Sequence, residues 1–135
     1  MSRIVLDTNV LVAGLRSRRG AANRLLRVVG RSSFEIALSV PLVLEYEDVL
    51  LRPQMVPFGP QEVRRFIDVL CLEGRLHRVY FLWRPYLPDP KDDMVLELAV
   101  AASCDAIVTY NQRDFRGVDR FGIRAVRPEA FLADL

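Results

Sequence analysis

Short apolar segments alternate with longer helical segments along this chain, and that alternation restricts its fold more than any other feature. Five segments have the β-branched, apolar composition of buried strands, at residues 3–6, 34–38, 78–82, 106–109 and 124–126. Six segments have helical periodicity, at residues 8–16, 23–29, 42–51, 61–73, 92–103 and 128–135. Strands that alternate with helices in this way predict an α/β fold with a parallel sheet of about five strands.

The size and composition agree with one globular domain. The chain has 135 residues, of which 51% are hydrophobic and 27% are charged. A disordered tail would have far fewer apolar residues, and a chain of this length buries enough surface to fold without disulfides or structural metals. We therefore expect a single domain over residues 1–135.

Cysteine and histidine usage excludes several classes of site. Cys71 and Cys104 have neither the spacing of a disulfide framework nor that of a zinc site, and His77 is the only histidine. A zinc centre built on paired histidines is therefore excluded. No apolar run approaches the ~20 residues of a membrane helix, and the N-terminus lacks a signal-peptide pattern. We expect a soluble protein of the reducing cytoplasm, with no membrane partner.

Acidic or amide side chains stand in apolar surroundings at four places. These candidates are Asp7 after the first strand, Glu45 in the third helix, Asp92 and Asp93 at the start of the fifth, and Asn111 and Asp114 after the fourth strand. Each has an ordinary explanation as a helix cap, an exposed helical position, a partner of the helix dipole or a turn residue. However, a parallel sheet gathers its ligand-binding loops at the carboxyl ends of its strands, so we expect these side chains to share one pocket.

Several carboxylates in one pocket repel one another and raise each other's pKa values unless a cation is bound. An all-oxygen ligand set without histidine or cysteine suits Mg²⁺ or Mn²⁺. A divalent ion held by carboxylates can activate water and neutralise charge on a phosphate. The acidic positions therefore predict a metal site for phosphate chemistry.

Four motifs of the chain resemble those of PIN domains. They are residues 3–14 (Arg-Ile-Val-Leu-Asp-Thr-Asn-Val-Leu-Val-Ala-Gly), 39–50 with Glu45, 89–99 with Asp92 and Asp93, and 106–115 with Thr109, Asn111 and Asp114. They come in the family's order and cover nearly the whole chain. The chain is also similar in size to the VapC-like toxins of type II toxin–antitoxin systems.

The resemblance implies a three-layer α/β/α fold with strand order 3-2-1-4-5. It also implies Mg²⁺- or Mn²⁺-dependent cleavage of single-stranded or structured RNA by a metal-activated water. Members of this group often form homodimers, and a small cognate antitoxin binds the toxin and blocks its site. These properties are expectations for the present chain.

The family's site residues are carried over position by position. Asp7 matches the first acid and Glu45 the second. Asp93 has the spacing expected of the third, sixteen residues before Thr109, and Asp92 is a second candidate. Many members have aspartate where this chain has Asn111, so Asp114 is expected to supply the charge, and a second metal position stays open. Hydrogen-bonding support is expected from Thr8, Asn9 and Thr109.

The net charge of +2 hides an uneven distribution. Residues 1–31 contain seven arginines and one acid, a net charge of +6, which suits a polyanionic partner. The basic side chains just after the first motif are predicted to guide RNA, or else to form a solvated surface or the antitoxin groove; they are Arg16, Arg18, Arg19 and Arg24. Two alternatives to the toxin nuclease stay open: a PIN-like RNA- or protein-binding module with a degraded site, and a housekeeping RNA-processing nuclease.

Overall fold

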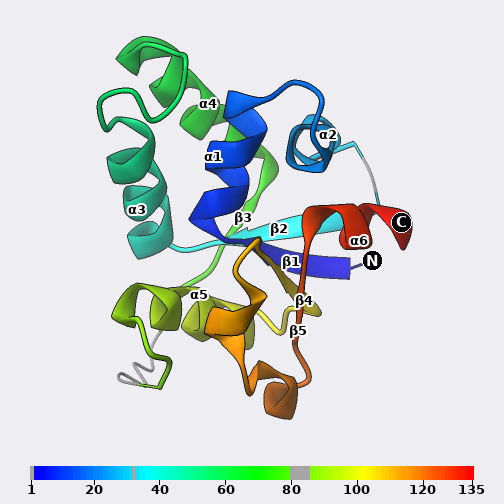
Figure 1. Ribbon diagram of the computed structural model, residues 1–135. Coiled ribbons are helices and arrows are strands. Elements are labelled where there is room, and N and C mark those ends of the chain that lie inside the picture. Colours follow the sequence, from blue (N-terminus) through cyan, green and yellow to red (C-terminus); the bar gives the residue numbers. More distant parts are fainter. Residues whose placement is uncertain (1, 32, 80–85) are drawn as a thin grey trace.

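The computed structural model describes residues 2–31, 33–79 and 86–135, and its centre is a five-stranded parallel sheet (Figure 1). The strands are β1 (Ser2–Leu6), β2 (Phe34–Leu38), β3 (Arg75–Leu76), β4 (Ala106–Val108) and β5 (Arg124–Val126). They lie in the order β3-β2-β1-β4-β5, and all four neighbouring pairs are parallel. The parallel α/β class and the expected strand order are both confirmed.

The third strand does not lie where the sequence predicts it. We expected residues 78–82, but the strand is β3 at Arg75–Leu76, Arg78 and Val79 lie outside any strand, and residues 80–82 are outside the described residues. β3 is the edge strand beside β2, with Ala37 opposite Arg75 and Leu38 opposite Leu76. Both of its side chains are exposed, so it lacks the apolar pattern by which a buried strand is recognised.

All six predicted helices are present, with both ends of each within two residues of the prediction. They are α1 (Thr8–Arg16), α2 (Ala21–Arg27), α3 (Val40–Leu50), α4 (Pro60–Glu73), α5 (Pro90–Ala101) and α6 (Pro128–Ala133). Two short 3₁₀ turns, η1 (Gln112–Phe115) and η2 (Val118–Phe121), follow β4. α5 covers one face of the sheet and α1 to α4 lie on the other side, which makes three layers (Figure 1). No helix of the described residues is long and apolar enough to cross a membrane.

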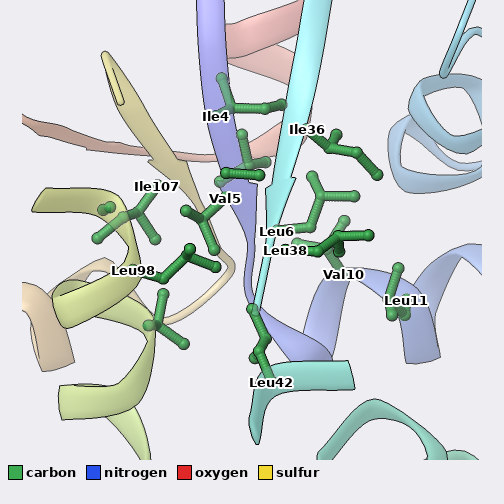
Figure 2. Close-up of a cluster of buried hydrophobic side chains, with 14 of the residues drawn as sticks. Ile4, Val5, Leu6, Val10, Leu11, Ile36, Leu38, Leu42, Leu98 and Ile107 are labelled. Atoms are coloured by element: carbon green, nitrogen blue, oxygen red, sulfur yellow. The ribbon is translucent and has the colours of Figure 1, made fainter. Parts of the chain in front are cut away.

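The central strand β1 is buried on both faces. Figure 2 shows Ile4, Val5 and Leu6 between the side chains of neighbouring strands and those of α1, α3 and α5. All three are at most 1% exposed. Burying each such side chain contributes roughly 1.5–3 kcal/mol relative to leaving it in water. This packing holds the carboxyl end of β1, and Asp7 directly after it, in the middle of the molecule.

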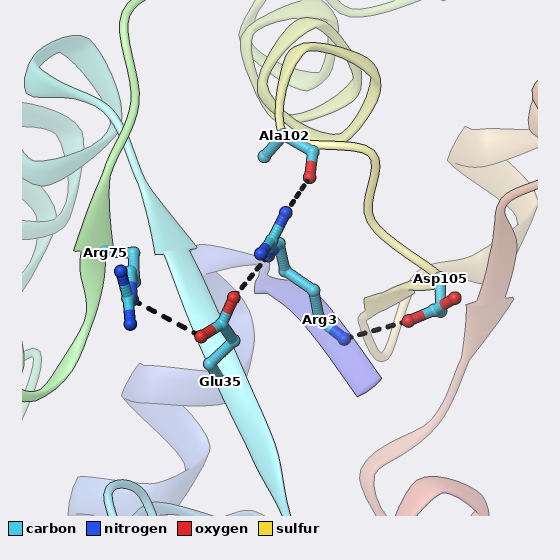
Figure 3. Close-up of polar contacts among 5 residues, drawn as sticks. All are labelled: Arg3, Glu35, Arg75, Ala102 and Asp105. Atoms are coloured by element: carbon cyan, nitrogen blue, oxygen red, sulfur yellow. Dashed lines mark hydrogen bonds and ion pairs between the residues drawn. The ribbon is translucent and has the colours of Figure 1, made fainter. Parts of the chain in front are cut away.

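A polar network ties the strands together in the amino-terminal half of the sheet (Figure 3). The Arg3 guanidinium donates to Glu35 on β2 and, at 2.7 Å, to the carbonyl of Ala102 after α5. The Arg3 backbone donates to Asp105 at 2.9 Å, and Arg75 on β3 lies 3.4 Å from the second Glu35 oxygen. The Arg3 hydrogen bond and the charges of Arg3 and Arg75 lower the pKa of Glu35.

Glu35→Gln is expected to lower the free energy of unfolding at pH 7. A carboxyl group whose pKa is lower in the folded state stabilises the fold above its unfolded-state pKa, and this contribution disappears as the pH falls through the folded-state pKa. Urea unfolding should therefore separate the variant from wild type at about pH 7 and bring them together at about pH 3. Arg75→Gln, which removes the more exposed partner, should cost less. An equal loss at both pH values would contradict the electrostatic explanation.

Candidate active site

A cavity of about 190 Å³ lies at the carboxyl edge of the sheet. Its walls come from the β1–α1 junction, α3, the start of α5 and the segment after β4. The lining residues are Asp7, Thr8, Asn9, Leu42, Glu45, Asp89, Lys91, Asp92, Val95, Asn111 and Asp114. We call this cavity the acidic pocket. It is formed here because all strands are parallel, so the segments that leave β1, β2 and β4 begin at the same edge.

Asp7 lies at the end of β1 and is only 8% exposed. One carboxylate oxygen accepts from the backbone N–H of Thr8 at 2.9 Å, and this bond caps α1. The other oxygen accepts from the hydroxyl of Thr109 at 2.7 Å. Burial raises the pKa of Asp7, and these two hydrogen bonds oppose the shift. Asp7 is therefore both the cap of α1 and a lining residue of the acidic pocket.

Asn9 and Thr109 link the ends of β1 and β4 beside Asp7. The amide of Asn9 donates to Asp7 at 3.2 Å, and its oxygen accepts from the backbone N–H of Tyr110 at 3.2 Å. The hydroxyl oxygen of Thr109 also accepts from the backbone N–H of Asn111 at 2.9 Å. These bonds orient the Asp7 carboxylate and join it to the segment that carries Asn111.

Glu45 reaches the acidic pocket from α3, where it is paired with a lysine. Its carboxylate lies 3.7 Å from the ammonium of Lys91 on α5. Lys91 is the only lysine in the chain, and among the described residues it is the only basic side chain in the lining of this pocket. The ion pair bridges α3 and α5 across the pocket and partly balances the charge of Glu45.

The structure separates the adjacent acids Asp92 and Asp93. Asp92 lines the acidic pocket, whereas Asp93 does not. Asp93 is 1% exposed and accepts hydrogen bonds from the backbone N–H groups of Tyr86, at 3.2 Å, and Leu87, at 2.8 Å. Its carboxylate therefore anchors the loop before α5. Of the two candidates for the third acid, Asp92 therefore lines the acidic pocket and Asp93 holds the loop before α5.

Asp89 is an acid of the lining that sequence analysis did not select. Its carboxylate accepts from the backbone N–H of Lys91 at 3.0 Å and caps α5. Because the start of α5 faces the pocket, the capping residue lines it too. The Asp-Pro-Lys-Asp-Asp run was the available signal, since it places one acid at the N-cap of a helix and two in its first turn.

Asn111 and Asp114 reach the pocket from the segment after β4. Asn111 is exposed and lies at the start of η1. The backbone N–H of Asp114 donates to the backbone carbonyl of Asn111 at 3.0 Å. The charge of Asp114 contributes to the raised pKa values of both Asp7 and Asp92. Asp114 therefore supplies a negative charge that Asn111 does not have.

The acidic pocket has the electrostatics of a cation site. Its lining, as far as the described residues form it, has five carboxylates and one lysine. Burial, together with the charges of Asp7, Asp89 and Asp114, raises the pKa of Asp92 to about 7. The donors are all oxygens, as hard divalent ions prefer. Within residues 2–31, 33–79 and 86–135, no three side chains form a ready-made ligand set. The pocket therefore fits a divalent ion in charge and donor type. Its carboxylates would have to move closer together to coordinate the ion.

The four arginines proposed to guide RNA lie away from this pocket. Arg16, Arg18 and Arg19 are at or beyond the far end of α1, whose nine residues span roughly 13 Å from Asp7. The Arg16 guanidinium donates to the carbonyl of Met55 at 2.6 Å. Arg24 lies on α2, and its charge adds to the Arg127 hydrogen bond that lowers the pKa of Glu129. None of the four lines the acidic pocket.

Fold and site together define an α/β domain with a carboxylate pocket at the carboxyl edge of a parallel sheet. The family model of the PIN domain matches residues 3–113, and the chain belongs to this family. A solved structure of similar fold is VapBC2 from Rickettsia felis bound to a DNA fragment from its promoter, with 13% identity and a TM-score of 0.63. The match covers 91% of this chain and 98% of that one. No curated protein matches the sequence.

Proposed function

We propose that the protein is a metal-dependent endoribonuclease and the toxin of a toxin–antitoxin pair. The observation that carries the nuclease is the acidic pocket, which lies where β1 and β4 of a PIN domain end. The similarity in fold to VapBC2 supports the toxin role. An antitoxin protein and a second copy of the chain are its proposed protein partners, and the cytoplasm its proposed location.

The proposed ligands of the ion, Mg²⁺ or Mn²⁺, are Asp7, Glu45, Asp92 and Asp114, with Asn111 as an oxygen donor. A bound divalent ion would polarise the phosphate and make water more acidic. Asp93 is proposed to act indirectly, because its carboxylate is used by the backbone of the loop before α5. The ion would also relieve the repulsion among the carboxylates, which raises the pKa of Asp92.

The other residues of the pocket have supporting roles in this proposal. The hydroxyl of Thr109 and the backbone N–H of Thr8 hold the two Asp7 oxygens in fixed directions. Asn9 ties this arrangement to β4 through Tyr110. Lys91 holds Glu45 at the pocket, and its exposed ammonium can approach a phosphate of the substrate. Orientation of ligands by such hydrogen bonds commonly affects activity 10–100-fold.

A PIN-like binding module without catalytic activity is the second candidate function. Asn111 favours it, because an amide at this position reduces the charge available to hold a second ion. A housekeeping RNA-processing nuclease would use the same site and differ only in its biological role. A small antitoxin reading frame just upstream of the gene would favour the toxin.

The purified protein should cut a labelled single-stranded RNA when Mg²⁺ or Mn²⁺ is supplied, and EDTA should stop the reaction. Gel electrophoresis of the products at several times measures the rate. Intact mass spectrometry of the same sample detects any co-purified antitoxin. If protein shown to be free of a partner leaves a panel of RNAs uncut with both ions, the binding module becomes the better explanation.

A further inference from the structure

A second, larger cavity adjoins the acidic pocket. It has a volume of about 550 Å³ and is lined by Tyr110, Asn111, Gln112, Arg113 and Asp114. Asn111 and Asp114 also line the acidic pocket, so the two cavities share a wall. We call the second cavity the Arg113 cavity. A ligand longer than one nucleotide could occupy both at once.

The two cavities differ in charge. Among the described residues, the acidic pocket has five carboxylates and one lysine, whereas the Arg113 cavity has one arginine and one aspartate. Asn111, at the boundary, is neutral. The Arg113 side chain is exposed and makes no ion pair or hydrogen bond with any residue that the structure describes. An anion therefore meets less repulsion in the Arg113 cavity than in the acidic pocket, although Asp114 lines both.

Two residues of this cavity are held in place by neighbouring segments. The Gln112 amide donates to the carbonyl of Ala125 on β5 at 3.0 Å. The guanidinium of Arg127 lies over the Tyr110 ring, 4.9 Å from its centre. Gln112 and Tyr110 therefore form a preformed wall, while the Arg113 side chain is free to reach a ligand. A planar guanidinium suits bidentate contact with a phosphate.

We propose that the Arg113 cavity binds the nucleotide next to the scissile phosphate, with the Arg113 guanidinium on its phosphate. This inference rests on the proposed nuclease function, because it places the substrate strand relative to the acidic pocket. In this inference the segment after β4 makes the contact with the RNA backbone that lies nearest to the scissile phosphate. The arginines at the far end of α1 would then contact only more distant parts of an RNA, or none.

The test compares Arg113→Gln with Arg18→Gln, which removes the same charge at the far end of α1. Binding of a fluorescein-labelled single-stranded RNA is measured by anisotropy in EDTA at several salt concentrations, and kcat and KM are measured with Mn²⁺. Arg113→Gln should raise Kd and KM about 5–10-fold and leave kcat nearly unchanged. The steepness with which the logarithm of the binding constant falls with the logarithm of the salt concentration (the salt slope) should decrease by about one. Arg113→Lys should recover part of the affinity. Thermal melting checks that the variants are folded.

Each outcome decides the inference separately from the nuclease. If wild type cleaves RNA while Arg113→Gln keeps the wild-type Kd, KM and salt slope, the inference is wrong and the nuclease stands. The inference is also wrong if Arg18→Gln weakens binding more than Arg113→Gln. If no RNA is cleaved but binding depends on Arg113, the proposed nuclease fails and with it the assignment to the nucleotide next to a scissile phosphate, and only an RNA-binding site at Arg113 is left. If wild type neither binds nor cleaves RNA, both fail.

Discussion

Asp7→Asn should reduce the rate of metal-dependent RNA cleavage by roughly 100-fold or more, without unfolding the protein. Asparagine is as good a helix N-cap as aspartate, so the bond to the Thr8 backbone can be kept. The variant loses a buried negative charge at the end of β1, beside Thr109 after β4. Loss of a charged ligand should exceed the 10–100-fold effects seen for residues that only support ligands. Initial rates with saturating Mn²⁺ and Mg²⁺ measure the effect.

Asp48→Asn is the matched control for this prediction. Asp48 is an exposed acid on α3 that pairs with Arg52 on the surface and does not line the acidic pocket. It undergoes the same chemical change, and its rate should stay close to that of wild type. Unfolding curves for both variants separate a catalytic loss from a loss of fold. If Asp7→Asn cleaves RNA as fast as Asp48→Asn, Asp7 does not hold a catalytic ion.

The central part of the fold could be predicted because its signals are local. Residues 3–9 contain most of the buried strand β1, the helix cap Asp7 and the first residues of α1 in one continuous segment. The helices follow from periodicity and from proline at their first positions, as in α4 and α5. β3 was misplaced since an exposed edge strand of two residues is defined by its pairing with β2, which sequence periodicity does not record.

Sequence spacing alone does not place Asp92 and Asp93 relative to the acidic pocket. Adjacent residues on a helix point about 100° apart, so Asp92 and Asp93 face different surroundings. Which one lines the acidic pocket depends on the loop before α5, whose backbone N–H groups at Tyr86 and Leu87 require a buried acceptor. Asp93 meets that need, and this leaves Asp92 for the pocket. Those contacts belong to the folded loop and have no separate sequence signature.

The positions of the arginines relative to the acidic pocket could not be predicted either, because closeness in sequence is not closeness in space. The first 31 residues have a net charge of +6, and Asp7 lies among them. However, α1 leads away from the sheet edge and carries Arg16 to Arg19 to its far end (Figure 1). Arg113 lies more than a hundred residues from Asp7 in sequence, yet it borders a cavity that shares residues with the acidic pocket. Pairing of β1 with β4 brings these distant segments together.

Asp92→Asn should make the metal-free protein more stable at pH 7.5, an unusual gain from changing a site residue. The pKa of Asp92 is raised from 3.8 to about 7, so the folded state binds its proton more tightly than the unfolded state does. The contribution of Asp92 to stability therefore falls as the pH rises from about 4 to about 7. The carboxyl group is partly exposed, and after allowance for solvent screening we expect a gain of about 1 kcal/mol. Urea unfolding in EDTA at pH 5 and pH 7.5 measures it.

Addition of Mn²⁺ should reverse the order of stability. Wild type should be stabilised by ion binding, since a ligand of the folded state alone shifts unfolding by mass action. Asp92→Asn should lose most of this gain. Asp93→Asn is the matched comparison: weaker hydrogen bonds to Tyr86 and Leu87 should cost about 1–3 kcal/mol with or without the ion. If instead Asp93→Asn abolishes the Mn²⁺ effect and Asp92→Asn keeps it, Asp93 is the ligand, because a residue that only anchors the loop would not remove ion binding selectively.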